Sequence, residues 1–334
     1  MVTIKDIARE TGLSSATVAR ALSDSGPAQA DTRRRVRETA ERLGYVASSA
    51  ARAMRNQSSN MIGLIVPDIV NRFYSEMAKA IGAACQEREL HFLLATSDDD
   101  PALELRQMRA MVSARVAALA LVPGPGSGPG LAALAARQPF AQLVRRSSVL
   151  SADWFGFEEQ DAIYRATVHL LDLGHRDIAL VCGGSDLSTG AGRRAGYARA
   201  LRVRGLVPDP RMVRAGPPTL AHGRAALHDL PGAATAVIAA GTLLTEAAVQ
   251  VIDAQGRNVP SDLSLIGFGV ESWHRWWRGG LTRVVPPVDL LTRSCAESLL
   301  ARISAAKPAP GEPPRTVTHD ARLIIGRTTA PPRS

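Results

Sequence analysis

The feature that most constrains the fold is a regular alternation of strand-like and helix-like segments from residue 60 onward. Short apolar runs at 61–68, 91–97, 117–124, 177–184, 235–241 and 263–269 alternate with helical patterns such as 73–89, 161–173, 191–204 and 243–255. Repeated βα units of this kind form parallel sheets that helices cover on both faces. There are too many units for a single sheet, so we expect two α/β lobes.

The size and composition of the chain favour a soluble protein with several domains. A chain of 334 residues, with 46% hydrophobic and 21% charged residues, fits two or three globular domains. No uncharged apolar run reaches the roughly 18 residues of a membrane helix, and charges near the N-terminus argue against a secretion signal. The three widely separated cysteines form neither a disulfide framework nor a metal motif. We therefore expect a cytoplasmic protein with no membrane association.

The basic charge of the chain is concentrated at its N-terminal end. Residues 1–60 contain 10 Lys and Arg and 6 Asp and Glu, a net charge of +4, whereas the other 274 residues contain 30 and 25, a net charge of +5. Basic side chains gain affinity for nucleic acid by releasing its counterions. The distribution indicates that a nucleic acid binds at this end.

The first 44 residues show the pattern of three short helices. Thr3 and Ser14 can cap the first two, Gly12 permits the turn between them, and the third helix, about 31–43, ends at Gly44. Residues at helical spacing can face a common core: Ile4, Ile7, Ala8, Val18, Ala21, Leu22, Val36, Ala40 and Leu43. This pattern fits a helix-turn-helix, although a generic three-helix scaffold has the same spacing.

The segment TIKDIARETGLSSATVARALSDSG, residues 3–26, resembles the N-terminus of the lactose-repressor/purine-repressor (LacI/GalR) family of bacterial transcription factors. The matching residues include both caps, the turn and both helix faces: Thr3, Ile4, Asp6, Ala8, Gly12, Ser14, Thr17, Val18, Arg20 and Leu22. The resemblance implies that Ser15, Ala16 and Arg20 read bases, and that Ser14 and Thr17 bind phosphates. Arginine can pair bidentately with guanine, whereas alanine offers only an apolar contact. We count Thr3, at the start of this motif, with the predicted DNA-binding residues.

Residues 45–59 resemble the hinge of the same family, in which a short segment becomes helical on DNA. Tyr45 and Ala51 match, and Met54 stands where the family has a leucine that enters the minor groove. Met54 can wedge a base step while Arg52 and Arg55 contact phosphates; simple hinge packing is the alternative for Met54. We include Ala51, Met54 and Arg55 among the predicted DNA-binding residues.

Three further motifs extend the resemblance to nearly the whole chain: LGHRDIALVCG at 173–183, RRAGYARAL at 193–201 and VPSDLSLIGF at 259–268. They imply a periplasmic-binding-protein-like (type I) core of two lobes joined by three crossovers, an effector in the cleft between them, and a homodimer. The expected domains are a helix-turn-helix domain (1–44), a hinge (45–59) and a core (60–330). Within the core we expect an N-lobe (60–158 and 288–318) and a C-lobe (160–286 and 320–330).

The effector residues that the resemblance implies are only partly preserved. Asn71, Phe73 and Tyr74 fall in the first loop of the family's pocket, with Arg72 in place of a proline, and Arg193 matches a ligand-binding arginine. Carboxylates common at two strand ends are missing, because Gly241-Thr242 and Gly269-Val270 stand in their place. Glu158 and Asp161 are nearby carboxylates that could substitute for them.

Three of the four tryptophans gather just after the second of these strand ends, and Trp273 and Trp276 could stack on a ligand. We predict effector contacts from Asn71, Phe73, Tyr74, Glu158, Asp161, Arg193, Gly241, Gly269, Trp273 and Trp276. Three hypotheses follow, in order of preference: an aromatic or apolar effector stacked on the tryptophans, a sugar held by substitute residues, or no effector. Packing is the alternative role of each tryptophan.

No motif indicates catalysis, a metal or a cofactor. The glycine-rich stretch 124–130 lacks phosphate-loop spacing, His169 and His175 have no ligand cluster nearby, and Ser185 and Ser188 lack a nucleophile elbow. We predict a sequence-specific transcriptional regulator, a repressor that binds a palindromic operator in double-stranded DNA as a homodimer and responds to a small molecule. A ligand-independent regulator, a solute-binding receptor and an enzyme are the alternatives.

Overall fold

The computed structural model describes residues 2–22, 29–45, 60–304 and 313–333. Contacts divide the chain into two compact units, Met1–Ser59 and Asn60–Ser334. The predicted hinge contacts Ala51, Met54 and Arg55 lie outside the described residues.

The N-terminal unit contains three helices, α1 (Ile4–Thr11), α2 (Ser15–Ala21) and α3 (Ala30–Arg42). Their shared core contains the apolar residues expected from the helical spacing: Ile7, Ala8, Val18, Ala21, Val36 and Ala40, with Ile4, Leu13, Leu22, Leu43 and Tyr45 packed against them. Gly12 takes a left-handed conformation (φ 67°) at the end of α1, which a side chain would resist. The prediction of a helix-turn-helix is confirmed.

The two predicted caps differ in how they work. The carboxylate of Asp6 accepts hydrogen bonds from the backbone N–H of Thr3 (2.9 Å) and from its hydroxyl (2.8 Å). The hydroxyl oxygen of Ser14 accepts a hydrogen bond from the backbone N–H of Thr17 (3.1 Å) and so caps α2. Gln29 precedes α3 without a capping hydrogen bond from its side chain.

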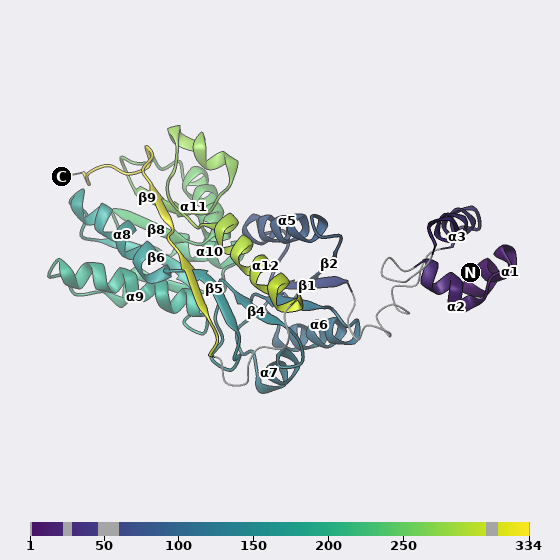
Figure 1. Ribbon diagram of the computed structural model, residues 1–334. Helices are drawn as coiled ribbons and strands as arrows, with labels where there is room; N and C mark the ends of the chain where they lie inside the picture. Colours follow the sequence, from purple (N-terminus) through teal and green to yellow (C-terminus); the bar gives the residue numbers. More distant parts are fainter. Residues whose placement is uncertain (1, 23–28, 46–59, 305–312, 334) are drawn as a thin grey trace. The chain divides into compact units, whose positions relative to one another are not determined.

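The second unit begins with a six-stranded sheet. Its strands are β1 (Met61–Val66), β2 (His91–Thr96), β3 (Ala118–Leu121), β4 (Phe140–Leu143), β5 (Asp153–Phe157) and β11 (Thr316–His319), in the order β11-β5-β4-β3-β1-β2. All neighbouring strands are parallel. Helices α5 (Arg72–Gln86) and α12 (Val288–Ser304) lie side by side on one face, and α6 (Pro101–Ser113) and α7 (Pro129–Ala135) cover the other (Figure 1). We call this sheet with its helices the N-lobe.

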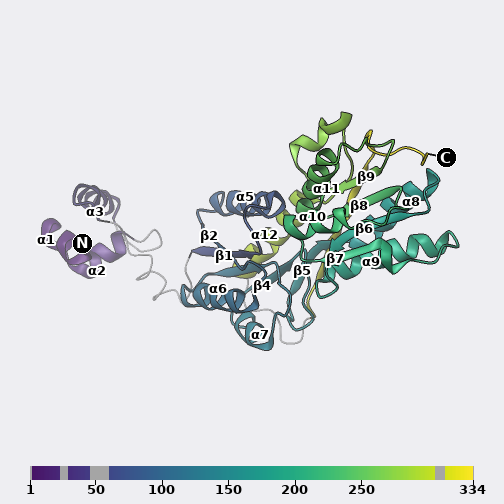
Figure 2. The ribbon, with the colours of Figure 1, turned by 180° about the vertical axis from the view of Figure 1, so that it is seen from behind.

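A second six-stranded sheet forms the C-lobe. Its strands are β6 (Ile178–Gly183), β7 (Val213–Gly216), β8 (Ala236–Ala240), β9 (Ser264–Phe268), β10 (Thr282–Val285) and β12 (Arg322–Ile324), in the order β12-β10-β9-β8-β6-β7. Only β12 is antiparallel to its neighbour. Helices α8 (Glu159–Asp172) and α9 (Ser188–Val203) pack together on one face, and α10 (Leu220–His228) and α11 (Thr242–Ala254) on the other (Figure 2). Single 3₁₀ turns occur at Pro210–Met212, Ser272–Arg275 and Trp277–Gly279.

Strand residues alternate between the two helical layers of each lobe, as the pleat requires. In β1, Ile62, Leu64 and Val66 belong to the core beneath α5 and α12, whereas Ile65 belongs to the core beneath α6 and α7. Both faces are therefore buried, which explains why these strands appear in the sequence as continuous apolar runs. The predicted two-lobed α/β fold with parallel sheets is confirmed.

The chain crosses between the lobes three times. It passes from β5 to α8 after Phe157, from β10 to α12 through Pro286 and Pro287, and from β11 to β12 through Asp320 and Ala321. The carboxyl ends of strands from both sheets consequently border one cleft. In the described part of the chain, no helix combines the length and the apolar character needed to span a membrane.

Candidate functional site: recognition helix and interlobe cleft

Helix α2 presents a polar face away from the core of the N-terminal unit. Val18 and Ala21 are fully buried, whereas Ser15, Ala16 and Arg20 are exposed on the other side of the helix. The Nε of Arg20 donates a hydrogen bond to the carbonyl of Ala16 (3.3 Å), and no ion pair of Arg20 is found within the described residues. Exposed Thr3 and Ser14 lie at the N-termini of α1 and α2, where a phosphate is favoured.

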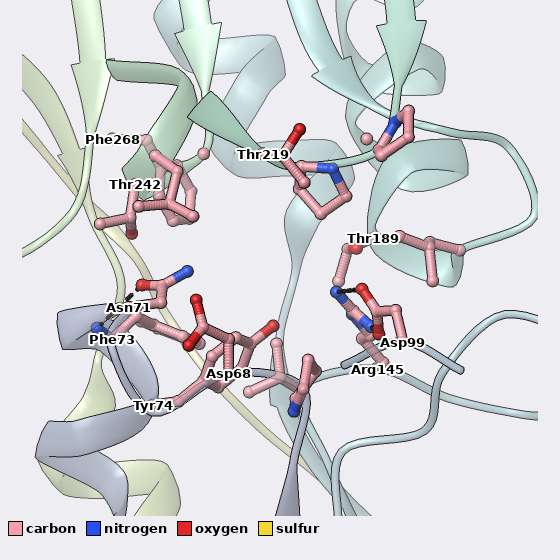
Figure 3. Close-up of a pocket in the computed structure, with 18 of the residues that line it drawn as sticks. Asp68, Asn71, Phe73, Tyr74, Asp99, Arg145, Thr189, Thr219, Thr242 and Phe268 are labelled. Atoms are coloured by element: carbon pink, nitrogen blue, oxygen red, sulfur yellow. Dashed lines mark hydrogen bonds and ion pairs between the residues drawn. The ribbon is translucent and has the colours of Figure 1, made fainter. Parts of the chain in front are cut away.

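A cavity of about 330 Å³ lies between the lobes (Figure 3). Its walls are formed where strands of the two sheets end and the following helices begin, which is where ligands bind in parallel α/β folds. The N-lobe contributes Pro67, Asp68, Asn71, Phe73, Tyr74, Asp98, Asp99, Val144 and Arg145; the C-lobe contributes Gly183, Leu187, Thr189, Arg193, Pro217, Pro218, Thr219, Gly241, Thr242, Leu243 and Phe268.

Arg145 and Asp99 form an ion pair in the N-lobe wall. One Nη of Arg145 donates to Oδ2 of Asp99 at 3.1 Å and the other Nη contacts Oδ1, so the pair is bidentate. The side chain of Arg145 is 4% exposed, whereas that of Asp99 is 26% exposed and can still accept from a ligand. Bidentate pairing holds both groups in a defined orientation.

Three residues of the same wall adopt a left-handed backbone: Asp98 (φ 50°), Asp99 (φ 55°) and Val144 (φ 60°). Such conformations cost free energy, most of all for a β-branched residue such as Val144. Strain of this kind often accompanies binding sites, because the surrounding structure holds side chains where a ligand needs them.

Arg193 is paired with a carboxylate in the C-lobe wall. Its Nε and one Nη donate to the two oxygens of Glu159 at 2.6 and 3.0 Å, and its other Nη donates to the carbonyl of Ala240 at 2.8 Å. The guanidinium lies over the ring of Phe268, 4.4 Å from its centroid. Burial raises the pKa of Glu159, and the charge of Arg193 opposes that rise. Glu159 thus orients Arg193 from behind the cleft.

Several polar groups of the cleft remain available to a ligand. One oxygen of Asp68 accepts from the N–H of Val70 (2.8 Å), and neither Asp68 nor Asp98 has an ion pair within the described residues. The side-chain oxygen of Asn71 caps α5 by accepting from the N–H of Phe73 (3.1 Å), which leaves its NH₂ group free to donate. Figure 3 shows Asp68, Asn71 and Tyr74 facing Thr219 and Thr242 across the cavity.

The structure brings five of the ten predicted effector residues into the cleft: Asn71, Phe73, Tyr74, Arg193 and Gly241. Glu158 is exposed at the start of α8, and Asp161 pairs with Arg165 (2.9 Å) on the surface of the same helix. The carboxylate of that segment that contacts a residue of the cleft is Glu159, which pairs with Arg193. Gly269 and the tryptophans do not line the cavity.

The tryptophans lie beyond the cleft, against the C-lobe core. Trp277 is 8% exposed and donates a hydrogen bond from its Nε1 to Asp253 on α11 (3.1 Å). Trp273 packs against the same core and contacts His274 edge to face, at 4.2 Å between ring centroids. Trp276 is 70% exposed. Packing therefore explains Trp273 and Trp277, and the position of the cluster gives no support to stacking on an effector in the cleft.

Sequence reasoning missed Asp68, Asp98, Asp99, Arg145 and the threonines of the cleft. Asp68 is the last residue of the first predicted strand, and Asp98 and Asp99 directly follow the second, so their places at strand ends were a usable signal. Arg145 offered none, since the short strand before it was not predicted. Among the described residues, no group of three or more His, Cys, Asp or Glu side chains could hold a metal ion.

Comparison with known proteins agrees with this architecture. Residues 3–48 match the bacterial regulatory proteins of the lacI family, and residues 167–329 match the periplasmic binding protein-like domain. The chain is 30% identical over 292 residues to the HTH-type transcriptional regulator DegA of Bacillus subtilis, covering 86% of this chain and 87% of DegA. It is also 30% identical over 305 residues to the regulator GalR of Escherichia coli, covering 90% and 89% of the two chains.

Solved structures share the fold. The lac repressor dimer bound to operator and the anti-inducer ONPF superimposes with a TM-score of 0.83 at 19% identity, covering 98% of this chain and 99% of the repressor chain. A complex of the transcriptional regulator CelR with cellobiose gives a TM-score of 0.71 at 25% identity, covering 98% and 100%. The chain therefore belongs to the lacI family of bacterial regulatory proteins, and it is a DNA-binding transcriptional regulator with a periplasmic-binding-protein-like core.

Proposed function

We propose that this regulator is a repressor that binds a palindromic operator as a homodimer, and that a small polyhydroxylated molecule in the interlobe cleft controls its affinity for DNA. The observation that carries the proposal is the convergence of polar side chains from both lobes on one cavity. A ligand that contacts both walls favours one arrangement of the lobes, and such a differential affinity is what allosteric control requires.

The charges of the cleft favour a neutral ligand with many hydroxyl groups. Arg145 and Arg193 are each neutralised by a carboxylate, so neither demands an anionic ligand. Asp68 and Asp98 can accept hydrogen bonds from hydroxyls, and the rings of Phe73 and Phe268 offer apolar faces. An apolar effector would leave each buried polar group without a partner, at a cost of about 1–3 kcal/mol per group. We therefore prefer a sugar to the aromatic effector that the tryptophans suggest.

The size of the cavity and the relatives support a small carbohydrate. A volume of about 330 Å³ is near the lower end of the range of ligand pockets, which is about 300–1,000 Å³. CelR was solved with cellobiose, and one relative, from Haemophilus influenzae, is named ribose operon repressor. The solved lac repressor dimer on its operator supports the same assembly for this chain.

DNA recognition is proposed to use α2, with Arg20 on a guanine and Ser14 and Thr17 on phosphates. Hinge residues Ala51, Met54 and Arg55 would then enter the minor groove. Because it would act on operator DNA, we propose that the protein works in the bacterial cytoplasm. The relatives, which are transcription regulators, support a regulator rather than an enzyme.

The test begins with operator sites enriched from genomic DNA by the purified full-length protein. Fluorescence anisotropy then measures its affinity for a selected site with and without each member of a panel of sugars, nucleobases and aromatic acids. We expect a sugar to change operator affinity, and Asp99→Asn to remove that response while operator affinity without ligand persists. A response to aromatic acids alone, or to no compound, would contradict the proposed effector class.

A further inference from the structure

A second cavity, of about 590 Å³, lies where two of the crossovers between the lobes meet. It shares no lining residue with the effector cleft, although Phe268 of the cleft ends β9 and Val270 of this cavity lies two residues further along the chain. We call it the hinge cavity; it is lined by Glu76, Val270, Arg275, Arg283, Val285, Pro286, Pro287, Val288, Asp289, Leu290, Asp320, Arg322 and Ile324.

The charges of the hinge cavity are separated by lobe. The C-lobe contributes three arginines, Arg275, Arg283 and Arg322, from the 272–275 turn, β10 and β12. The opposite wall is acidic and contains Glu76 of α5, Asp289 of α12 and Asp320 of the last crossover. Within the described residues, no ion pair joins these two walls, and the partner of Glu76 is Arg72 on the same helix (3.0 Å).

Arg283 lacks an acceptor for part of its guanidinium. One Nη donates to the carbonyl of Leu281 (3.1 Å), but the Nε is buried and has no hydrogen-bond partner among the described residues. Burial lowers the pKa of Arg283, the charge of Arg275 lowers it further, and Glu271 opposes both. Arg275 and Arg283 both line this wall, and the effect of Arg275 on the pKa of Arg283 shows that the two cations are neighbours, so an oxyanion is favoured there.

The acidic wall argues against a simple anion. An anion between the walls is attracted by the arginines but repelled by Glu76, Asp289 and Asp320, so the repulsion offsets the attraction. A molecule with an oxyanion at one end and an ammonium group at the other gains from both walls.

We propose that the hinge cavity binds a small zwitterion, with its oxyanion on Arg275 and Arg283 and its ammonium group toward Glu76 and Asp289. Because the two arginines belong to the C-lobe and the two carboxylates to the N-lobe, the bound zwitterion stabilises one arrangement of the lobes. It is a second input to the regulator, distinct from the ligand in the effector cleft.

Isothermal titration calorimetry of the full-length protein tests the proposal. The zwitterionic probes are the common L-amino acids, each titrated alone, and phosphoethanolamine; inorganic phosphate and ethylamine are the singly functional controls. We expect at least one zwitterion to bind more tightly than either control. Binding by amino acids identifies a carboxylate ligand, and binding by phosphoethanolamine identifies a phosphate ligand.

Variants then locate the site. Arg283→Gln and Arg275→Gln are each expected to weaken zwitterion binding by about 10-fold or more, because each removes a hydrogen bond to a charged group. Arg202→Gln, which removes an exposed arginine of α9, is the matched control and leaves binding unchanged. Asp99→Asn, in the effector cleft, also leaves it unchanged, which separates this site from the proposed effector site.

The proposal is overturned if no zwitterion binds at millimolar concentration, if inorganic phosphate binds as tightly as the best zwitterion, or if Arg275→Gln has no effect. Arg275 is exposed, so this variant remains informative even if Arg283→Gln fails to fold.

Discussion

Asp98 combines a strained backbone with a free carboxylate at the effector cleft. Its φ of 50° is a conformation in which glycine has no steric cost. We expect Asp98→Gly to change the free energy of unfolding by less than about 1 kcal/mol, while weakening effector affinity by about 10-fold or more. Thermal unfolding and calorimetry with the effector measure the two quantities.

Asp98→Ala is the matched control for the backbone. It removes the same carboxylate but keeps a Cβ in the left-handed conformation, so we expect it to lower stability by about 1 kcal/mol relative to Asp98→Gly. Retained effector affinity in both variants would show that the carboxylate does not bind the effector.

His274 is a fully buried histidine, and among the described residues the nearest charged group to its ring is the carboxylate of Glu271, 3.3 Å from Nε2. Burial and the charge of Arg283 lower the pKa of His274 to about 4. Its unfolded pKa is about 6.5, so between these values the unfolded chain binds the proton more tightly. The contribution of the neutral His274 imidazole to the free energy of unfolding is complete above about pH 6.5. It is lost as the pH falls toward 4, by roughly 3 kcal/mol in total.

We expect His274→Gln to reduce the loss of stability between pH 6.5 and 4, as measured by urea unfolding at several pH values. Part of the wild-type loss remains, since burial also lowers the pKa values of His169 and His175. Glu271, 3.3 Å from His274, acts in the opposite sense because burial raises its pKa. His91→Gln, on an exposed strand position, is the control. If the free energy of unfolding of His274→Gln fell with pH as steeply as that of the wild type, His274 would not be a source of the loss.

At the scale of one element, α2 is built to present a rigid polar face. The Ser14 cap fixes its start, and Val18 and Ala21 fix its inward side. We expect Arg20→Ala to lower discrimination between operator and random DNA by about 1–3 kcal/mol, the worth of a bidentate contact with guanine. The discrimination of Arg20→Lys should fall between those of the wild type and Arg20→Ala, because lysine keeps the charge but lacks the planar guanidinium that pairs with guanine.

Fluorescence anisotropy on both DNAs measures this discrimination. Arg9→Ala is the control, since Arg9 lies exposed on α1 beside Asp6 (3.4 Å) and outside the predicted base-reading set. Equal discrimination by the wild type and Arg20→Ala would remove α2 from the role of recognition helix.

At the scale of the whole molecule, the two units have separate hydrophobic cores. The core of residues 4–45 shares no member with the three cores of the second unit. We therefore expect a fragment of residues 60–334 to fold, to bind the effector with the affinity of the full chain and to lose operator binding. Circular dichroism, calorimetry and anisotropy check these outcomes, and a fragment that folds but does not bind the effector would contradict them.

Much of the fold could be predicted because its signals are local. Caps, turns and helical spacing identify α1 to α3, and long apolar runs identify β1, β6, β8 and β9. The strands β4 and β5, of four and five residues, were not predicted, since short segments such as FAQL carry no periodicity of their own. The apolar residues of β4 and β5 are explained by the neighbouring strands that they pair with, and those neighbours are known only from the tertiary structure.

The sequence by itself determined the helix-turn-helix, the α/β alternation and the family, because periodicity, capping and motif spacing act over a few residues. Tertiary structure alone decided which side chains meet. Asp68, Arg145 and Arg193 lie far apart in the chain and converge because it crosses three times between lobes whose strands end at one cleft. The same packing directs Trp273 and Trp277 to the C-lobe core, and Trp277 is held there by Asp253 of α11, which no local pattern could reveal.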